Sequence, residues 1–301
     1  MRPLLDMDTI QIEITNACNH SCSNCTRLVG HHVKPYFMEF DQFKQAVDSL
    51  EDYPKMIGMM GGEPLLHPEF EKLCEYLATK IPASRCGLWS GFPKGKEHYR
   101  DIILKTFGQV FLNDHSRTDI LHGPVLVASE ELPAEQWLKD YMIDHCWIQN
   151  SWSASINPRG AFFCEIAAAL SMLTKEGLGW PVETGWWHRS SKDFADQMAQ
   201  YCKMCGAAMP LNQRPSCEGI DDISPKMFKR ISVTSPKIKR GDYEIHDLRF
   251  SQDKKRGAAY KDREYRECIA NRYGLSLALN SKGFETPYLR PDGVGFPVKE
   301  K

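Results

Sequence analysis

The sequence predicts an α/β fold built on a parallel sheet that tends to curl. Short apolar segments rich in β-branched residues alternate with amphipathic segments of helical period over residues 9–142. Strict alternation of strands and helices implies right-handed crossovers between parallel strands. The chain has 301 residues, which is enough for one large or two modest domains.

Each predicted element has a local signal. Residues 9–15 (TIQIEIT) alternate in polarity, Asp41 is the expected N-cap of the first helix, and Pro68 opens the second helix. Cys74 falls on the apolar stripe of that second helix, so we expect it to pack rather than to bind a metal. The predicted strands are 9–15, 55–60, 85–90, 110–113 and 125–128, and the predicted helices are 42–51, 69–80, 99–107 and 135–142.

The role expected of the cysteines depends on the cellular compartment. No segment approaches the ~18 consecutive apolar residues of a membrane span, and the N-terminal residues lack the pattern of a signal peptide. We therefore expect a cytoplasmic protein, in which disulfides are rare. Of the 11 cysteines, an odd number, seven fall into ligand-like groups, which indicates metal sites.

The first group lies in residues 15–27, directly after the first predicted strand. Cys18, Cys22 and Cys25 can hold three irons of a cubic four-iron cluster and leave the fourth iron without a protein ligand. A zinc site needs four ligands, so zinc would require a further residue such as His20, and three unrelated core cysteines are the plain alternative. A second special loop, Gly61-Gly62-Glu63-Pro64, follows the second predicted strand.

The second group begins after residue 142. Two short strands around the turn at 157–160 (NPRG) predict a β-hairpin between Cys146 and Cys164, followed by helices at 166–177 and 192–201. Cys202 and Cys205 follow the second of these helices. Four cysteines suit an iron–sulfur cluster, whereas Cys202 and Cys205 with a partner such as His188 would suit zinc.

The first group and the glycine loop together resemble the radical S-adenosylmethionine (SAM) enzymes, over roughly residues 8–142. The resemblance implies a partial, truncated TIM-like (β/α) barrel and a [4Fe–4S] cluster on Cys18, Cys22 and Cys25. The open iron would chelate the amino and carboxylate groups of SAM, and residues 61–64 would receive its amino group. An electron from a donor such as flavodoxin or ferredoxin would then cleave SAM to methionine and a 5′-deoxyadenosyl radical.

The same resemblance bears on three further positions. The ribose of SAM is expected to contact residues at later strand ends, for which Ser90 and Asn113 are the candidates. The residue before the third cysteine, often aromatic in the family, is Asn24 in this chain.

The second group resembles the auxiliary-cluster modules called SPASM and, in shortened form, twitch. The resemblance implies one auxiliary [4Fe–4S] cluster on Cys146, Cys164, Cys202 and Cys205, in a C-terminal module that contains a β-hairpin and helices. Short modules on a truncated barrel are similar to those of 2-deoxy-scyllo-inosamine dehydrogenase and neomycin epimerase, which act on aminoglycoside-type rings. We therefore expect a barrel over 1–143, an auxiliary module over 144–220 and a basic extension over 221–301.

These resemblances predict oxidation or epimerisation of a carbohydrate-like substrate. In oxidation the auxiliary cluster accepts an electron from the substrate radical, whereas epimerisation needs a hydrogen donor, for which Cys217 is the candidate and a plain free thiol is the alternative. A peptide-modifying SPASM enzyme is the second hypothesis, but a first strand near residue 9 leaves no room for the usual peptide-binding domain. The third hypothesis is a non-catalytic metal module that binds nucleic acid. It does not explain why the glycine loop at residues 61–64 follows a predicted strand.

Two further features are open to two interpretations. The basic C-terminal quarter suits a phosphorylated, nucleotide-linked or lipid-linked substrate, or else a solvated face. Its residues in question are Lys226, Lys229, Arg230, Lys237, Lys239 and Arg240. The tryptophans of the second module would stack on sugars or form the core of the module. They are Trp152, Trp180, Trp186 and Trp187.

Overall fold

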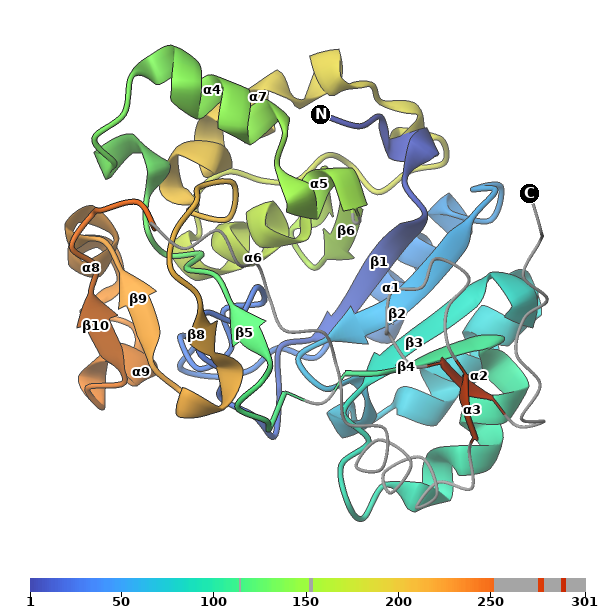
Figure 1. Cartoon of the computed structure of the whole chain (residues 1–301). Coiled ribbons are helices and arrows are strands. Elements are labelled where there is room, and N and C mark those ends of the chain that lie inside the picture. The colour runs from blue at the N-terminus through green and yellow to red at the C-terminus, as the bar shows by residue number, and fades with distance from the viewer. Residues whose placement is uncertain (114, 152–153, 252–275, 279–287, 291–301) are drawn as a thin grey trace.

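The centre of the protein is one mixed sheet with a parallel middle (Figure 1). The computed structural model describes residues 1–113, 115–151, 154–251, 276–278 and 288–290. Five neighbouring strands of the sheet are parallel. In spatial order they are β4 (Gln109–Leu112), β3 (Cys86–Ser90), β2 (Met56–Gly61), β1 (Thr9–Thr15) and β6 (Ala154–Asn157).

Antiparallel strands complete the two edges of this sheet. β7 (Gly160–Phe162) pairs with β6, while β12 (Tyr288–Arg290) pairs with β4 and β11 (Ser276–Ala278) pairs with β12. In the described part of the chain the two outermost strands, β7 and β11, do not pair with each other, so the sheet stays open. The predicted α/β class and partial barrel are confirmed.

Three helices connect the first four strands and lie together on one side of the sheet (Figure 1). They are α1 (Phe40–Ser49), α2 (Phe70–Lys80) and α3 (Arg100–Thr106). Cys74 is fully buried in α2, which confirms its packing role. The predicted N-cap Asp41 is wrong: α1 begins two residues earlier than predicted, and Glu39 forms a capping box with Gln42.

The predicted strand at residues 125–128 is also wrong. These residues are a buried connection whose backbone bonds go to two different segments: Leu126 O accepts from Ser224 N (3.1 Å) and Val125 O accepts from Gly206 N (3.3 Å). An apolar run shows burial, but it does not show whether the partner is a sheet or a loop. The place beside β1 is taken instead by β6, which comes from the hairpin.

The hairpin itself is confirmed, with Asn157 opposite Gly160 at its turn. The helices of this half are α4 (Gln136–Asp144), α5 (Trp147–Ser151), α6 (Glu165–Thr174) and α7 (Ala195–Tyr201). α6 is shorter than predicted, because Lys175 already adopts a left-handed conformation (φ 58°). Since β6 joins β1, the hairpin continues the main sheet, and the domain limits at residues 143 and 220 stay predictions.

A smaller layer lies beyond the carboxyl end of β1 (Figure 1). In it β9 (Asp221–Ile223) pairs in parallel with β10 (Tyr243–Ile245), and β5 (Leu121–His122) pairs with β8 (Arg214–Pro215). The short helices α8 (Pro225–Ile231) and α9 (Pro236–Lys239) connect β9 to β10. Residues 221–251 are thus packed structure that continues the fold.

The tryptophans of the second module belong to its core. Trp186 and Trp187 are buried, and Trp187 packs edge-on against Tyr53 while its Nε1 donates to Ser49 O (3.1 Å). Trp180 is half-buried against Trp186, and Trp152 lies outside the described residues. The structure therefore supports the packing interpretation for these rings. Among the described helices, none has the length and apolarity that crossing a membrane requires.

Candidate functional site

The first cysteine site consists of Cys18, Cys22 and Cys25 in the loop that follows β1. Burial raises the pKa of the Cys18 thiol to about 12, and it raises the pKa of Cys22 and Cys25 as well. For Cys22 the charges of the other two sulfurs raise the pKa further, so the three thiols lie close enough to act on one another. Such thiols become good ligands when iron supplies the compensating positive charge.

The glycine loop holds the cysteine loop directly. Gly62 N donates to Thr15 O and Glu63 N donates to Ala17 O, both at 2.7 Å. A Cβ on Gly61 would lie 2.0 Å from Thr15 O, and a Cβ on Gly62 would lie 2.2 Å from Ala17 O. Only glycine permits this approach. An ammonium group has only donors, so one bound here would contact carbonyl oxygens of the loop.

Glu63 joins the ends of β2 and β3. Its carboxylate accepts hydrogen bonds from Leu65 N (3.0 Å), Ser90 Oγ (2.7 Å) and Gly91 N (2.8 Å). Burial raises the pKa of Glu63 to about 7, although these bonds act in the opposite direction. Pro64 begins the short 3₁₀ helix (Pro64–Leu66) that Glu63 caps.

The two candidate ribose contacts lie at neighbouring strand ends, joined by the bond from Asn113 N to Ser90 O (2.7 Å). The Ser90 hydroxyl donates to Glu63 and accepts from Phe92 N (2.9 Å), so its one proton is already used. Asn113 Oδ1 pairs with His115 Nε2 (2.7 Å). Contact of Ser90 and Asn113 with SAM stays a prediction.

A histidine pair continues from Asn113 to the cysteine loop. His115 Nδ1 lies 3.0 Å from His122 Nε2, and His122 Nδ1 lies 2.7 Å from Ser23 O. Burial lowers the pKa of both imidazoles, which favours their neutral forms. Sequence analysis missed this pair, because neither histidine belongs to a motif.

Asn24 has a structural role that accounts for its departure from the family pattern. It adopts a left-handed conformation (φ 49°), which asparagine tolerates better than aromatic residues do. Its side chain donates to Asp222 Oδ2 (2.8 Å) and accepts from Asp222 N (2.9 Å). The asparagine thus fastens the cysteine loop to β9.

A buried ion network joins the cysteine loop to α6. Arg27 Nη1 lies 3.1 Å from Glu13 Oε1, and Nη2 lies 3.1 Å from Glu165 Oε2, with all three side chains at most 4% exposed. Arg27 follows Cys25 by two residues, and Glu165 directly follows Cys164. No sequence signal predicted this link, because 138 positions separate the two residues.

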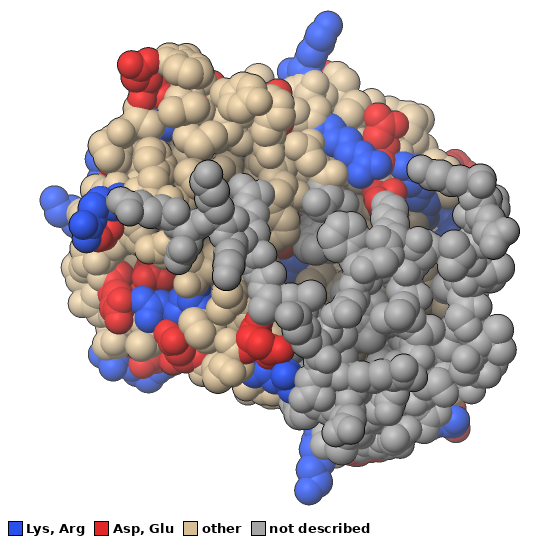
Figure 2. Space-filling model, in the orientation of Figure 1, with Lys and Arg blue, Asp and Glu red and all other residues tan. Residues whose placement is uncertain are grey.

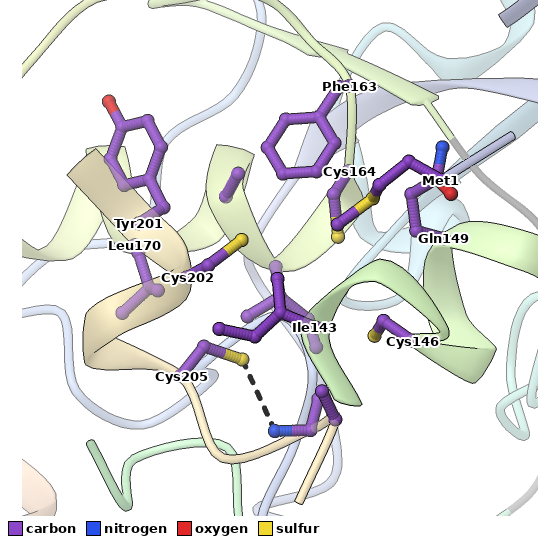
Figure 3. Close-up of a pocket in the computed structure, with 14 residues that line it drawn as sticks. Met1, Ile143, Cys146, Gln149, Phe163, Cys164, Leu170, Tyr201, Cys202 and Cys205 are labelled. Carbon is purple, nitrogen blue, oxygen red and sulfur yellow. Dashed lines mark hydrogen bonds between the residues drawn. The ribbon is translucent and has the colours of Figure 1, made fainter. Parts of the chain in front are cut away.

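The second cysteine site consists of Cys146, Cys164, Cys202 and Cys205. All four line one cavity, together with apolar side chains such as Ile143, Phe163 and Leu170 (Figure 3). They come from the start of α5, the N-cap of α6 and the 3₁₀ turn after α7. Separate segments therefore converge on one sulfur-lined space.

The electrostatics of this cavity suit a four-thiolate group. Burial raises the pKa of Cys205 to about 12 and also raises the pKa of Cys164 and Cys202. For each of these three thiols, Cys146 raises the pKa further. Ala207 N donates to Cys205 Sγ (3.4 Å; Figure 3), the type of bond that stabilises cluster sulfurs.

The zinc alternatives receive no support from His188. This residue is exposed, it stacks on Trp187, and it does not line the cavity. Within the described ranges, no three His, Cys, Asp or Glu side chains are close enough together to ligate one metal ion.

Cys217, the candidate hydrogen donor, lies in a short turn (Ser216–Glu218) and is exposed. Ser216 O accepts from Ser23 N (2.8 Å), so this turn adjoins the cysteine loop. The described cysteines, which leave out Cys268, form no disulfide.

Several basic residues in the described part of the C-terminal quarter have acidic partners. Lys226 pairs with Glu130 (3.4 Å), Arg240 pairs with Asp242 (2.9 Å), and Arg230 pairs with Glu176. Figure 2 shows acidic and basic side chains intermixed over the region of β9 and β10. This supports the interpretation as a solvated face, while Lys237 is buried at the cysteine loop.

One family model and two solved structures are similar to parts of the chain. Residues 12–113 match the family model described as the Radical SAM superfamily. The crystal structure of BtrN in complex with AdoMet and 2-DOIA is 13% identical, with a TM-score of 0.44 over 65% of this chain and 88% of that one. The crystal structure of selenomethionine BtrN in an open conformation is 12% identical, with a TM-score of 0.41 over 66% of this chain and 88% of that one.

No curated protein matches the chain. The matched segment contains the first cysteine site and the glycine loop. Members of this superfamily are enzymes that use a [4Fe–4S] cluster and SAM. Residues 12–113 therefore form a radical SAM domain.

Proposed function

We propose that this enzyme is a radical SAM dehydrogenase that oxidises a hydroxyl-bearing carbon of a carbohydrate-like substrate. The observation that carries the proposal is the second cysteine site, where four thiols from separate segments line one cavity. A cluster with four thiolate ligands has no open iron, so it is suited to accept an electron and not to bind substrate. Dehydrogenation needs such an acceptor.

In this proposal Cys18, Cys22 and Cys25 hold the SAM-binding cluster. Carbonyl oxygens of residues 61–64 receive the amino group of SAM, and Glu63 orients that loop through its bonds to the end of β3. When bound, the cluster and SAM supply a 5′-deoxyadenosyl radical that abstracts a hydrogen atom from the substrate. Reduced flavodoxin or ferredoxin is the proposed electron donor.

The oxidation balances with one electron acceptor and one proton acceptor. Loss of the hydrogen atom leaves a hydroxyl-bearing carbon radical, which becomes a carbonyl when it releases one proton and one electron. A cluster held by Cys146, Cys164, Cys202 and Cys205 would supply the acceptor for the electron, and solvent water would accept the proton. Epimerisation would instead need a hydrogen donor shielded from solvent, and the exposure of Cys217 does not favour that role.

The test compares substitutions of two cysteines. Anaerobically reconstituted protein should hold about eight irons, and Cys202→Ala should lower this to about four. Cys74→Ala is the matched control, since Cys74 is buried in the core of α2 and should leave the iron content unchanged. Cys202→Ala should still cleave SAM but yield no carbonyl product from a panel of aminocyclitols and amino sugars.

Three results would contradict the proposal. A wild-type iron content near four that Cys202→Ala does not change would show that the protein has no second cluster. SAM cleavage by Cys22→Ala would show that the first cluster is not held by Cys18, Cys22 and Cys25. Solvent deuterium in an otherwise unchanged sugar product would show epimerisation in place of oxidation.

A further inference from the structure

Lys237 is the basic residue of the C-terminal quarter that touches the cysteine loop. Its side chain is fully buried, which is rare for lysine unless the ammonium group is paired. The Nζ atom donates to Cys22 O (2.8 Å) and lies 3.0 Å from Asp221 Oδ2. A positive charge is thus held beside the first cysteine site by a residue of α9.

Asp221 places a negative charge on the same loop. Its Oδ1 accepts a hydrogen bond from Asn24 N, directly before Cys25, and its Oδ2 lies 2.6 Å from His31 Nε2. The other ring nitrogen of His31 pairs with Ser235 Oγ (2.7 Å). The carboxylate therefore has hydrogen-bond partners at both oxygens, and its position relative to Cys25 is set.

The two charges act on the cysteine sulfurs with opposite sign. The Lys237 ammonium lies against the backbone carbonyl of Cys22, and the Asp221 carboxylate lies against the amide of Asn24, next to Cys25. Reduction of an iron–sulfur cluster adds a negative charge, which the nearby ammonium of Lys237 favours and the nearby carboxylate of Asp221 disfavours. Burial strengthens the response because water does not screen the pair.

We propose that the buried Lys237–Asp221 pair tunes the reduction potential of the SAM-binding cluster, with Lys237 raising the potential and Asp221 lowering it. Both are positioning residues, since they contact the backbone of the loop, Lys237 at Cys22 O and Asp221 at Asn24 N. The inference rests on the proposed assignment of Cys18, Cys22 and Cys25 as cluster ligands. It gives a structural reason why the segment after residue 220 packs on the cysteine loop.

The experiment measures the midpoint potential of the full-length protein by redox titration with electron paramagnetic resonance. The signal that changes when SAM is added reports the first cluster. All titrations are made at one and the same pH. Iron content is measured first for every variant.

Lys237→Met should lower, and Asp221→Asn should raise, the ratio of reduced to oxidised cluster at a given potential by roughly tenfold each. A tenfold change corresponds to about 59 mV for one electron. The double variant Lys237→Met/Asp221→Asn should return close to the wild-type value. Lys239→Met is the matched control, because Lys239 is exposed on the same helix and should change nothing.

Shifts of the two single variants in the same direction, or no shift in either, would overturn the inference and leave only a structural role. If Lys237→Met fails to hold the cluster, Asp221→Asn alone decides: a raised potential supports the inference, and an unchanged or lowered one refutes it. If wild-type protein gives no SAM-responsive signal, the proposed function itself fails. If that signal is present but neither variant shifts the midpoint potential, only the tuning is refuted and the proposed function stands.

Discussion

Arg27→Met should destabilise the protein more than most single substitutions do. The guanidinium of Arg27 lies 3.1 Å from both Glu13 Oε1 and Glu165 Oε2, and these side chains are at most 4% exposed. Removing it leaves two buried carboxyl groups without their cation. Breaking a buried ion pair in this way costs about 3–5 kcal/mol.

The pH dependence of this loss follows from the carboxyl groups. Burial already raises the pKa of Glu13 while Arg27 lowers it, so the pKa of Glu13 should rise further in the variant. A folded-state pKa above the unfolded value means that the folded variant binds more protons, so its stability falls as pH rises. Holding one carboxyl protonated costs about 1.4 kcal/mol per pH unit, so lowering the pH from 7 to 5 should recover about 2–3 kcal/mol.

Urea unfolding of iron-free protein, followed by tryptophan fluorescence at pH 7 and pH 5, measures both quantities. Arg100→Met is the matched control, because Arg100 pairs with Asp101 at the surface and should cost less than about 1 kcal/mol. Adding Glu165→Gln to Arg27→Met should restore part of the stability. A loss below about 1 kcal/mol, or a loss that does not vary with pH, would refute the reasoning.

Three further outcomes follow from the geometry of the loops. Gly62→Ala places a Cβ 2.2 Å from a carbonyl oxygen, so reconstituted protein should lose the SAM-responsive cluster signal, whereas Gly123→Ala, with no atom within 4 Å, should keep it. Because the pKa of Glu63 is about 7 in place of the usual 4.5, the free energy of unfolding of iron-free protein should fall by up to about 3 kcal/mol between pH 4.5 and 7, and Glu63→Gln should remove this slope in urea titrations. Asn24→Ala breaks two buried hydrogen bonds with Asp222 and should cost about 2–4 kcal/mol in the same assay, so an unchanged midpoint would contradict its fastening role.

Local pattern predicted the elements whose signals are periodic. Alternating polarity marked β1, and the apolar stripe of α2 gave the packing role of Cys74 correctly. The N-cap of α1 was not predicted correctly, since Asp41 and Glu39 both suit a helix start. Only the capping box with Gln42 identifies Glu39 as the cap. The apolar run at 125–128 was wrongly predicted as a strand, because hydrophobicity indicates that a segment is buried but not which segment it packs against.

The sequence by itself was enough to predict the chemistry of the first site, because Cys18, Cys22, Cys25 and the glycine loop lie within short stretches with a characteristic spacing. Only the tertiary structure brought the four cysteines of the second site to one cavity and placed β6 beside β1. It alone decided that Lys237 would lie against Cys22, across 215 positions. Spacing along the chain reports contacts between near neighbours, whereas the pairing of buried charges depends on how distant segments pack.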